Sequence, residues 1–211
     1  MAHLVDGVVS TPVIMAGAAL AVVGIAVGLR RIEGERLPYC GLMSAAFFVA
    51  SLVHVPLGPS NVHLILNGLL GIVLGWAAVP AIFVGLLLQA LLFGYGGITV
   101  LGVNTVIMGL PAVACFYLFA SMVRRNGRRT WAWGALAGAF AILSTCGGIG
   151  AALALSGREF LPAAQLVFVA HVPVMVVEAV ITGTVVVFLQ RVKPEVLVLA
   201  MRLPAGHPGR A

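Results

Sequence analysis

The sequence predicts an all-α polytopic membrane protein with seven transmembrane helices, its amino terminus outside and its carboxyl terminus in the cytoplasm. Of the 211 residues, 62% are hydrophobic and only 9% are charged, whereas soluble chains carry roughly 25% charged residues. Apolar runs recur along the chain, and a helix needs about 20 such residues to cross hydrocarbon. The third observation is where the basic residues fall between these runs.

The apolar runs predict helices in seven places. The first, over residues 11–30, begins with Ser10, Thr11 and Pro12, which is a cap followed by a proline in the first turn. We expect the others over residues 38–54, 63–77, 79–93, 102–123, 131–154 and 161–191. Pro80 would mark the turn between the third and fourth helices, and a six-helix alternative would fuse those two into a re-entrant pair. Residues 1–195 then form a single membrane domain, and residues 196–211 form a cytoplasmic tail.

The basic residues predict the orientation. With the amino terminus outside, Arg158 is the only one of the 12 Lys and Arg residues on an outer segment. Because cytoplasmic loops are enriched in Lys and Arg, this asymmetry predicts a multi-pass protein of the cell (inner) membrane. The residues before the first apolar run include Asp6 but no Lys or Arg. A cleavable signal peptide has a basic segment there, so this run does not resemble one. The net charge of +6 is explained by topology, and no nucleic-acid partner is expected.

Four histidines fall on the outer side of this topology: His3, His54, His63 and His171. His3 lies within reach of a free terminal amine and backbone amides, and a flat array of nitrogen donors suits Ni(II), Cu(II) and plausibly Co(II). The apolar loop over residues 94–104 is expected to fold into the domain and line a pocket, because irregular backbone at membrane depth must be covered by protein.

Three polar residues are candidates for orienting metal ligands in a pocket: His54, Asn67 and Asn104. Asn67 lies four residues after His63 and would share a face of the helix that we expect to open at His63.

A further pair lies inside the last predicted helix. His171 and Glu178 are seven residues apart on one helical face, and ionisable residues inside a membrane helix are functional candidates. The alternative is that Glu178 pairs with a polar partner across the bundle or on another subunit.

Motifs for catalysis are missing from the sequence. It contains no GxxxxGK[ST] phosphate loop, no HExxH motif and no nucleophile paired with a base. We therefore expect a transport subunit rather than an enzyme, with any ATP hydrolysis carried out by partner subunits.

Three elements of the sequence resemble the CbiM/NikM family, the substrate-binding membrane subunits of energy-coupling-factor cobalt and nickel transporters. Residues 3–7, His-Leu-Val-Asp-Gly, stand where the family has an early His followed by Asp-Gly or Glu-Gly. Residues 56–64 resemble its Gly-Pro-(Thr/Ser)-x-Val-His-Leu element, and residues 88–104 resemble another signature. The likeness covers nearly the whole chain and is weakest in the tail.

The resemblance implies a seven-helix fold and a metal held by nitrogens: the terminal amine, the amide and imidazole of the early His, and the His of the second element. These map onto the amino terminus, Met1 or Ala2, and onto His3 and His63. The implied function is high-affinity capture of extracytoplasmic Co(II) or Ni(II), with cobalt favoured, for cobalamin biosynthesis or nickel enzymes. No permanent cofactor is implied, because the metal is cargo. The implied partners are a membrane coupling subunit, two ATPase subunits and a small accessory membrane subunit.

The position of the early histidine leaves two ligand sets open, because the family has His second and here Ala2 intervenes. If Met1 is removed, the Ala2 amine, the His3 amide and imidazole, and His63 give the family's four nitrogens. If Met1 stays, residues 1–3 supply four nitrogens themselves, and His63 is displaced or axial.

Two other functions are weighed against metal capture. One is a vitamin-binding subunit of the same transporter type, which would need an aromatic-lined pocket, yet the chain has only three Trp and three Tyr. The other is a membrane enzyme using His171 and Glu178, which would be active without ATPase partners.

Overall fold

The computed structural model describes residues 3–32, 34–57, 60–125 and 127–199. In chain order its helices are α1 (Thr11–Leu29), α2 (Leu37–Ala50), α3 (Asn67–Leu74), α4 (Ala78–Phe93), α5 (Leu101–Arg124), α6 (Thr130–Ser156), α7 (Leu161–Val192) and α8 (Pro194–Leu199). Short 3-10 turns are η1 (Gly34–Arg36), η2 (Gly75–Ala77) and η3 (Arg158–Phe160). Strands β1 (His54–Leu57) and β2 (Ser60–His63) form an antiparallel hairpin, so the described fold is helical apart from this one element.

Five helical runs are long and apolar enough to cross a bilayer: α1, the combined run from α3 to α4, α5, α6 and α7. α2 is a shorter apolar helix of 14 residues. Large apolar side chains such as Met15, Leu20 and Val22 on α1 are exposed, and a monomeric protein in water rarely presents so continuous an apolar face. The architecture is therefore that of a multi-pass membrane protein.

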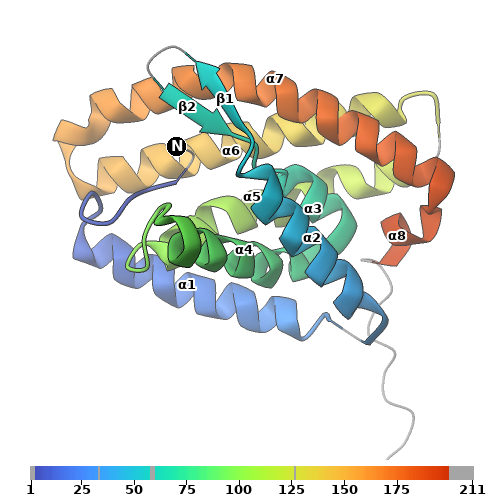
Figure 1. Cartoon of the computed structure of the whole chain (residues 1–211), viewed down its shortest axis with the longest axis horizontal. Coiled ribbons are helices and arrows are strands. Elements are labelled where there is room, and N and C mark those ends of the chain that lie inside the picture. The colour runs from blue at the N-terminus through green and yellow to red at the C-terminus, as the bar shows by residue number, and fades with distance from the viewer. Residues whose placement is uncertain (1–2, 33, 58–59, 126, 200–211) are drawn as a thin grey trace, which may run out of the picture.

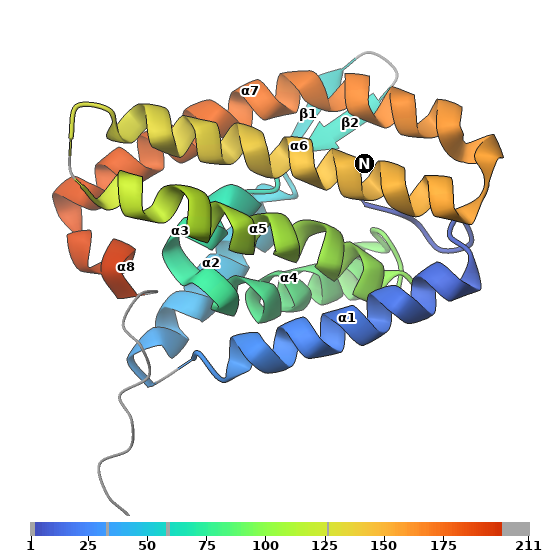
Figure 2. The same ribbon diagram turned by 180° about the vertical axis from the view of Figure 1, so that it is seen from behind.

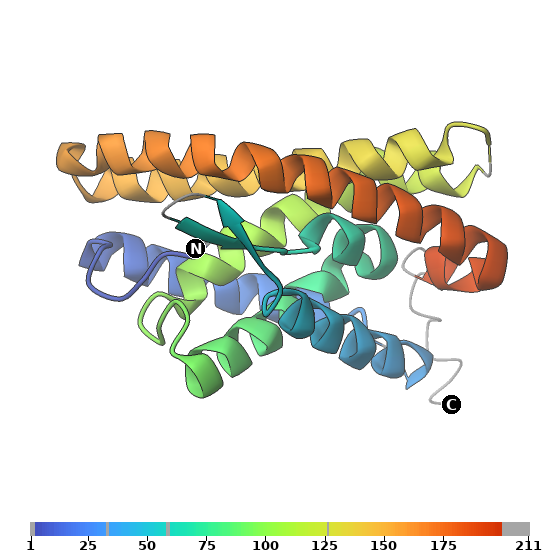
Figure 3. The same ribbon diagram turned by 45° about the horizontal axis from the view of Figure 1, so that its top comes forward.

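The helices pack in a flattened bundle. α6 and α7 lie side by side along one edge, α1 runs along the opposite edge, and α4 and α5 lie between them (Figure 1). From behind, α5 is seen between α6 and α1 (Figure 2). The β1–β2 hairpin lies against α7 (Figure 3).

The basic residues gather at one end of this bundle. α1, α5 and α7 all end on the side where α8 lies (Figures 1 and 2), and these helices end at or next to Arg30, Arg124 and Arg191. This is the clustering that the orientation expected from the sequence requires; which side of the membrane it faces stays a prediction.

The third predicted helix, over residues 63–77, is wrong in its bounds. His63 ends strand β2, and α3 begins only at Asn67 and ends at Leu74. Eight residues make a helix about 12 Å long, far short of the ~30 Å hydrocarbon core. The turn into α4 falls at η2 rather than at Pro80, because Gly75 adopts φ +59°, a backbone conformation that glycine accepts readily.

α3 is short but central, and every one of its residues is buried. A Cβ at Gly71 would lie 1.9 Å from the Ala112 carbonyl oxygen of α5, so the α3 and α5 backbones touch at this point. Small residues allow such close helix contact in membrane proteins, where apolar burial alone gives no advantage over lipid. The packing of α3 on α5 thereby fixes where the segment after β2 enters the core.

Candidate metal centre

Two histidines from distant parts of the chain meet inside the bundle. The rings of His3 and His63 are stacked, with centroids 4.5 Å apart and planes 26° apart. Both residues are buried, with 7% and 2% of their surface exposed. His3 arrives on the segment that precedes α1, and His63 arrives at the end of β2. The structure thus brings together the two imidazoles that the sequence singled out.

The segment that carries His3 is tied to the first turn of α5. The Leu4 N–H donates to the Asn104 side-chain oxygen, and the Asn104 amide donates back to the Leu4 carbonyl, each at 3.0 Å. Leu4 and Asn104 are themselves buried. A primary amide can donate and accept at once, so one side chain satisfies both backbone groups of the residue next to His3.

The loop between α4 and α5 holds the same segment from the other side. The Asp6 N–H donates to the Gly96 carbonyl at 3.2 Å, and the Asp6 carboxylate accepts from the Thr99 hydroxyl and from the Val100 N–H. Gly97 has φ +142°, and a Cβ there would lie 2.1 Å from the Asp6 carboxyl carbon. Within the expected loop over residues 94–104, residues 101–104 form the first turn of α5, Val100 is buried, and Ile98 is 63% exposed; the contacts above show that part of the loop packs on the histidine segment.

His63 is oriented by the backbone that follows it. Its Nδ1 lies 3.0 Å from the Leu64 carbonyl oxygen. A carbonyl only accepts, so this bond places the proton on Nδ1 and the lone pair on Nε2, the atom then available to a metal. In the hairpin the Cα of His63 is paired with that of His54.

The next two residues are held by a buried acid. The Ile65 and Leu66 N–H groups both donate to Glu178 Oε1 on α7. Leu66 has φ +57°, the single left-handed conformation among the described non-glycine residues. The chain therefore turns from strand to helix at a strained residue whose N–H is fixed by Glu178.

Burial determines the charge of His3. Loss of solvent around the ring lowers the pKa of His3 well below its usual range, and the neighbouring His63 ring lowers that pKa further. His3 is therefore neutral at pH 7, with a lone pair to offer. Both of its ring nitrogens are buried and lack a hydrogen-bond partner among the described residues. A buried, unpaired imidazole is costly unless something else binds it, which fits a ligand to a cation.

Two imidazoles alone do not complete a metal site. Among the described residues, no group of three His, Cys, Asp or Glu side chains lies close enough to hold a metal ion. Main-chain nitrogens of the first residues are the further donors that the sequence led us to expect. Met1 and Ala2, the expected source of those nitrogens, lie outside the described residues.

Asn67 does not take the place expected for it. Because His63 lies on a strand, the two residues do not share a helical face, and the Asn67 amide donates to the Met108 carbonyl at 3.2 Å and to the Thr145 hydroxyl at 2.9 Å. Asn104 binds the main chain of Leu4, next to His3, rather than an imidazole.

Of the two expectations for His171 and Glu178, the structure agrees with the alternative, in which Glu178 has polar partners across the bundle. His171 Nδ1 lies 2.7 Å from the Val167 carbonyl of its own helix, while Glu178 binds the segment after His63. Seven residues span about 10.5 Å along a helix, beyond the reach of a hydrogen bond. His171 is nevertheless close enough to His3 to influence its charge.

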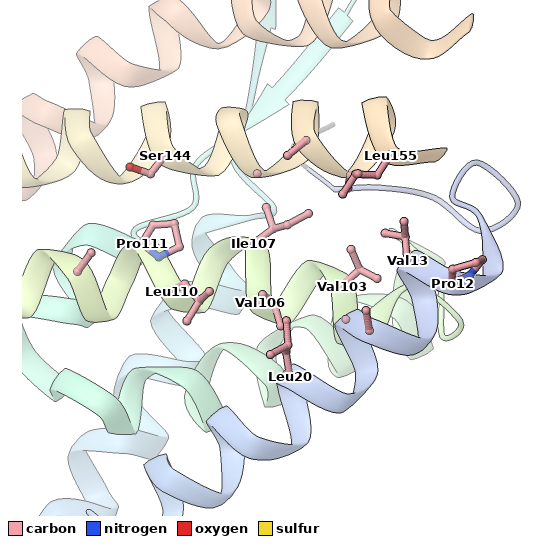
Figure 4. Close-up of a pocket in the computed structure, with 16 residues that line it drawn as sticks. Pro12, Val13, Leu20, Val103, Val106, Ile107, Leu110, Pro111, Ser144 and Leu155 are labelled. Carbon is pink, nitrogen blue, oxygen red and sulfur yellow. The ribbon is translucent and has the colours of Figure 1, made fainter. Parts of the chain in front are cut away.

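A large apolar cavity lies apart from this centre. It has a volume of about 740 Å³ and lies between α1, α5 and α6 (Figure 4). Its lining is apolar apart from the hydroxyl of Ser144, and includes side chains such as Leu20, Ile107 and Leu155. It offers no converging donors for a cation, and suits apolar matter.

Comparison with known proteins agrees with the chemistry of the centre. Residues 3–196 match the CbiM family model, described as the cobalt uptake substrate-specific transmembrane region. The chain is 46% identical to a Haemophilus influenzae protein named for metal transport, over 92% of this chain and 96% of that one. It is 31% identical to the cobalt transport protein CbiM of Sorangium cellulosum, over 92% and 94% of the two chains.

Two further likenesses extend the comparison. A fused nickel transport protein, NikMN of Rhodobacter capsulatus, is 33% identical over 75% of this chain and 46% of its own length. The crystal structure of a truncated transition metal transporter superposes with a TM-score of 0.72 at 27% identity, over 90% of this chain and 98% of that one. The fold, the paired histidines and these matches together place the chain in the CbiM family of cobalt and nickel transport proteins.

Proposed function

We propose that this chain is the substrate-specific subunit of an ATP-driven energy-coupling-factor importer, and that it captures Co(II) or Ni(II) from outside the cell. The observation that carries the proposal is the convergence of His3 and His63 in a buried pocket. Neutral imidazole suits late first-row ions, and burial keeps His3 neutral. The large cavity lies apart from these polar groups, so no comparable observation supports the alternative of a vitamin-binding subunit.

The proposed ligands are the two imidazoles, the His3 main-chain amide and a free terminal amine. Nitrogen–metal bonds are about 2 Å long, and rings with centroids 4.5 Å apart need only side-chain rotation to share one ion. This proximity favours the set in which His63 is the fourth nitrogen, as expected if Ala2 is the terminus. A deprotonated amide binds such ions in a flat array and discriminates against Mg(II) and Ca(II).

The test is calorimetric titration of the purified full chain with Ni(II) and Co(II). His3→Ala and His63→Ala should each lose more than the roughly 10–100-fold in affinity that removal of a supporting residue costs. His207→Ala, in the C-terminal tail, is the matched control and should bind as the parent does. A tag fused ahead of residue 1 should also abolish binding. Undiminished affinity in both His3→Ala and His63→Ala would overturn the assignment.

The remaining parts of the importer belong to the same proposal. The R. capsulatus relative is a fused protein of which this chain matches about half, which supports a separate small accessory membrane subunit here. A membrane coupling subunit and two ATPase subunits would supply the energy. Cobalt uptake into cells should require all of these with the chain, and accumulation by the chain alone at the full rate would contradict ATP coupling.

A further inference from the structure

Glu178 is a buried acid whose surroundings do not explain it as a structural ion pair. Its side chain is 1% exposed and lies midway along α7. No basic side chain pairs with it within the described part of the chain, and its carboxylate accepts hydrogen bonds from two backbone N–H groups, those of Ile65 and Leu66. A carboxylate in such a place is costly in a membrane helix, so its contacts should matter to function.

Those two contacts bear directly on His63. Ile65 and Leu66 follow it by two and three residues, and Leu66 is held in the strained left-handed conformation at φ +57°. Since the Leu66 N–H is one of the donors, the carboxylate stabilises the bend that the strain opposes. Straightening of this bend would move the Leu64 carbonyl, which orients the His63 ring through Nδ1.

The helix that carries Glu178 is itself fixed at this turn. A Cβ at Gly138 of α6 would lie 2.6 Å from the Glu178 carbonyl oxygen, so the two backbones pack without side chains between them. From here α7 runs on to Val192, next to Lys193 at the basic end of the bundle. Glu178 thus links the segment after His63 to α7, the helix that runs on to the basic end of the bundle.

We infer that Glu178 is a positioning residue, which holds the segment after His63 so that the His63 ring faces the cargo metal. The inference rests on the proposed function, because it has meaning only if His63 binds the metal. It assigns Glu178 no contact with the ion, and it replaces the expected pairing with His171.

The test compares Glu178→Ala and Glu178→Gln with Thr182→Val. Thr182 lies one turn further along α7, is fully buried, and its hydroxyl has no hydrogen-bond partner among the described residues. We expect Glu178→Ala to weaken Ni(II) binding about 10- to 100-fold. Glu178→Gln keeps an acceptor oxygen and should lose less, and Thr182→Val should bind as the parent does.

A double mutant separates positioning from general stability. If Glu178 acts through His63, adding Glu178→Ala to His63→Ala should cost no further affinity. The electron paramagnetic resonance spectrum of bound Cu(II), used as a probe, should in Glu178→Ala match that of His63→Ala. Additive losses in the double mutant, or a parent-like spectrum and affinity in Glu178→Ala, would overturn the inference.

The outcomes also distinguish this inference from the proposed function. If His3→Ala and His63→Ala bind Ni(II) normally, the metal centre itself is wrong, whatever Glu178 does. If those two lose binding while Glu178→Ala does not, the centre stands and the positioning role fails. Should Glu178→Ala not fold, Glu178→Gln is carried through the same cycle, and its loss must likewise vanish in the His63→Ala background.

Discussion

Asn104 offers a direct measure of how far the metal centre depends on its support. Replacement by Ala removes both hydrogen bonds to the main chain of Leu4, which is 4% exposed. An unpaired buried N–H or C=O costs about 1–3 kcal/mol. Two such groups cost at least about 2 kcal/mol, unless the segment that carries His3 leaves its place and becomes hydrated.

Metal binding weakens if the segment leaves its place in the metal-free protein, because part of the binding free energy is then used to restore the segment. At about 1.4 kcal/mol for each tenfold change, a cost of about 2 kcal/mol predicts a loss of about 30-fold in Ni(II) affinity. The helical bundle should remain intact, since the Asn104 side chain bonds to the main chain of Leu4 and not to another helix of the described structure.

The assay is competitive Ni(II) titration of Asn104→Ala against a chelator of known affinity, with thermal unfolding of the metal-free protein recorded alongside. Thr105→Val is the matched control: Thr105 is equally buried, but its hydroxyl bonds only to the Leu101 carbonyl of its own helix. Asn104→Ala binding within threefold of the parent would refute the reasoning, as would an equal loss in Thr105→Val.

Two further predictions test the same centre. Gly97→Ala should weaken Ni(II) binding, because the new Cβ would strain the backbone and collide with the Asp6 carboxylate. Gly94→Ala is the control: Gly94 has φ +66° and nothing within 4 Å, so this change should only add backbone strain. Equal Ni(II) affinities in the two variants would contradict the prediction. Proton release on Ni(II) binding at pH 7, measured calorimetrically in several buffers, should be about two if Ala2 is the terminus (one amide, one amine) and about three if Met1 remains. Affinity should then fall by about tenfold per pH unit for each proton released as the pH drops below 7, and release of only about one proton would contradict binding by the amide and the amine together.

The sequence was sufficient for the class of protein and for the two central residues. Apolar run lengths and the bias of basic residues predict a membrane bundle, because both follow from bilayer physics rather than from details of packing. The topology places His3 and His63 on one side together with His54 and His171, the family resemblance singles out the first two, and the structure stacks their rings. Asn104 was found as well, although its bond to Leu4 was not.

The bend between β2 and α3 could not be predicted. The apolar run beginning at His63 favours a helix. A leucine does not predict a left-handed conformation, which costs a non-glycine residue about 1–2 kcal/mol. That conformation persists because Glu178, 112 residues away, accepts the Leu66 N–H. Local propensity contains no information on such a partner, so the start of α3 and the partner of Glu178 were missed together.

The two histidines are positioned by the same device on different helices. On α5, a buried amide fixes the main chain beside His3, and on α7 a buried carboxylate fixes the main chain after His63. The distance between the imidazoles therefore depends on the spacing of α5 and α7. A shift between these helices would separate the two imidazoles without touching either ring.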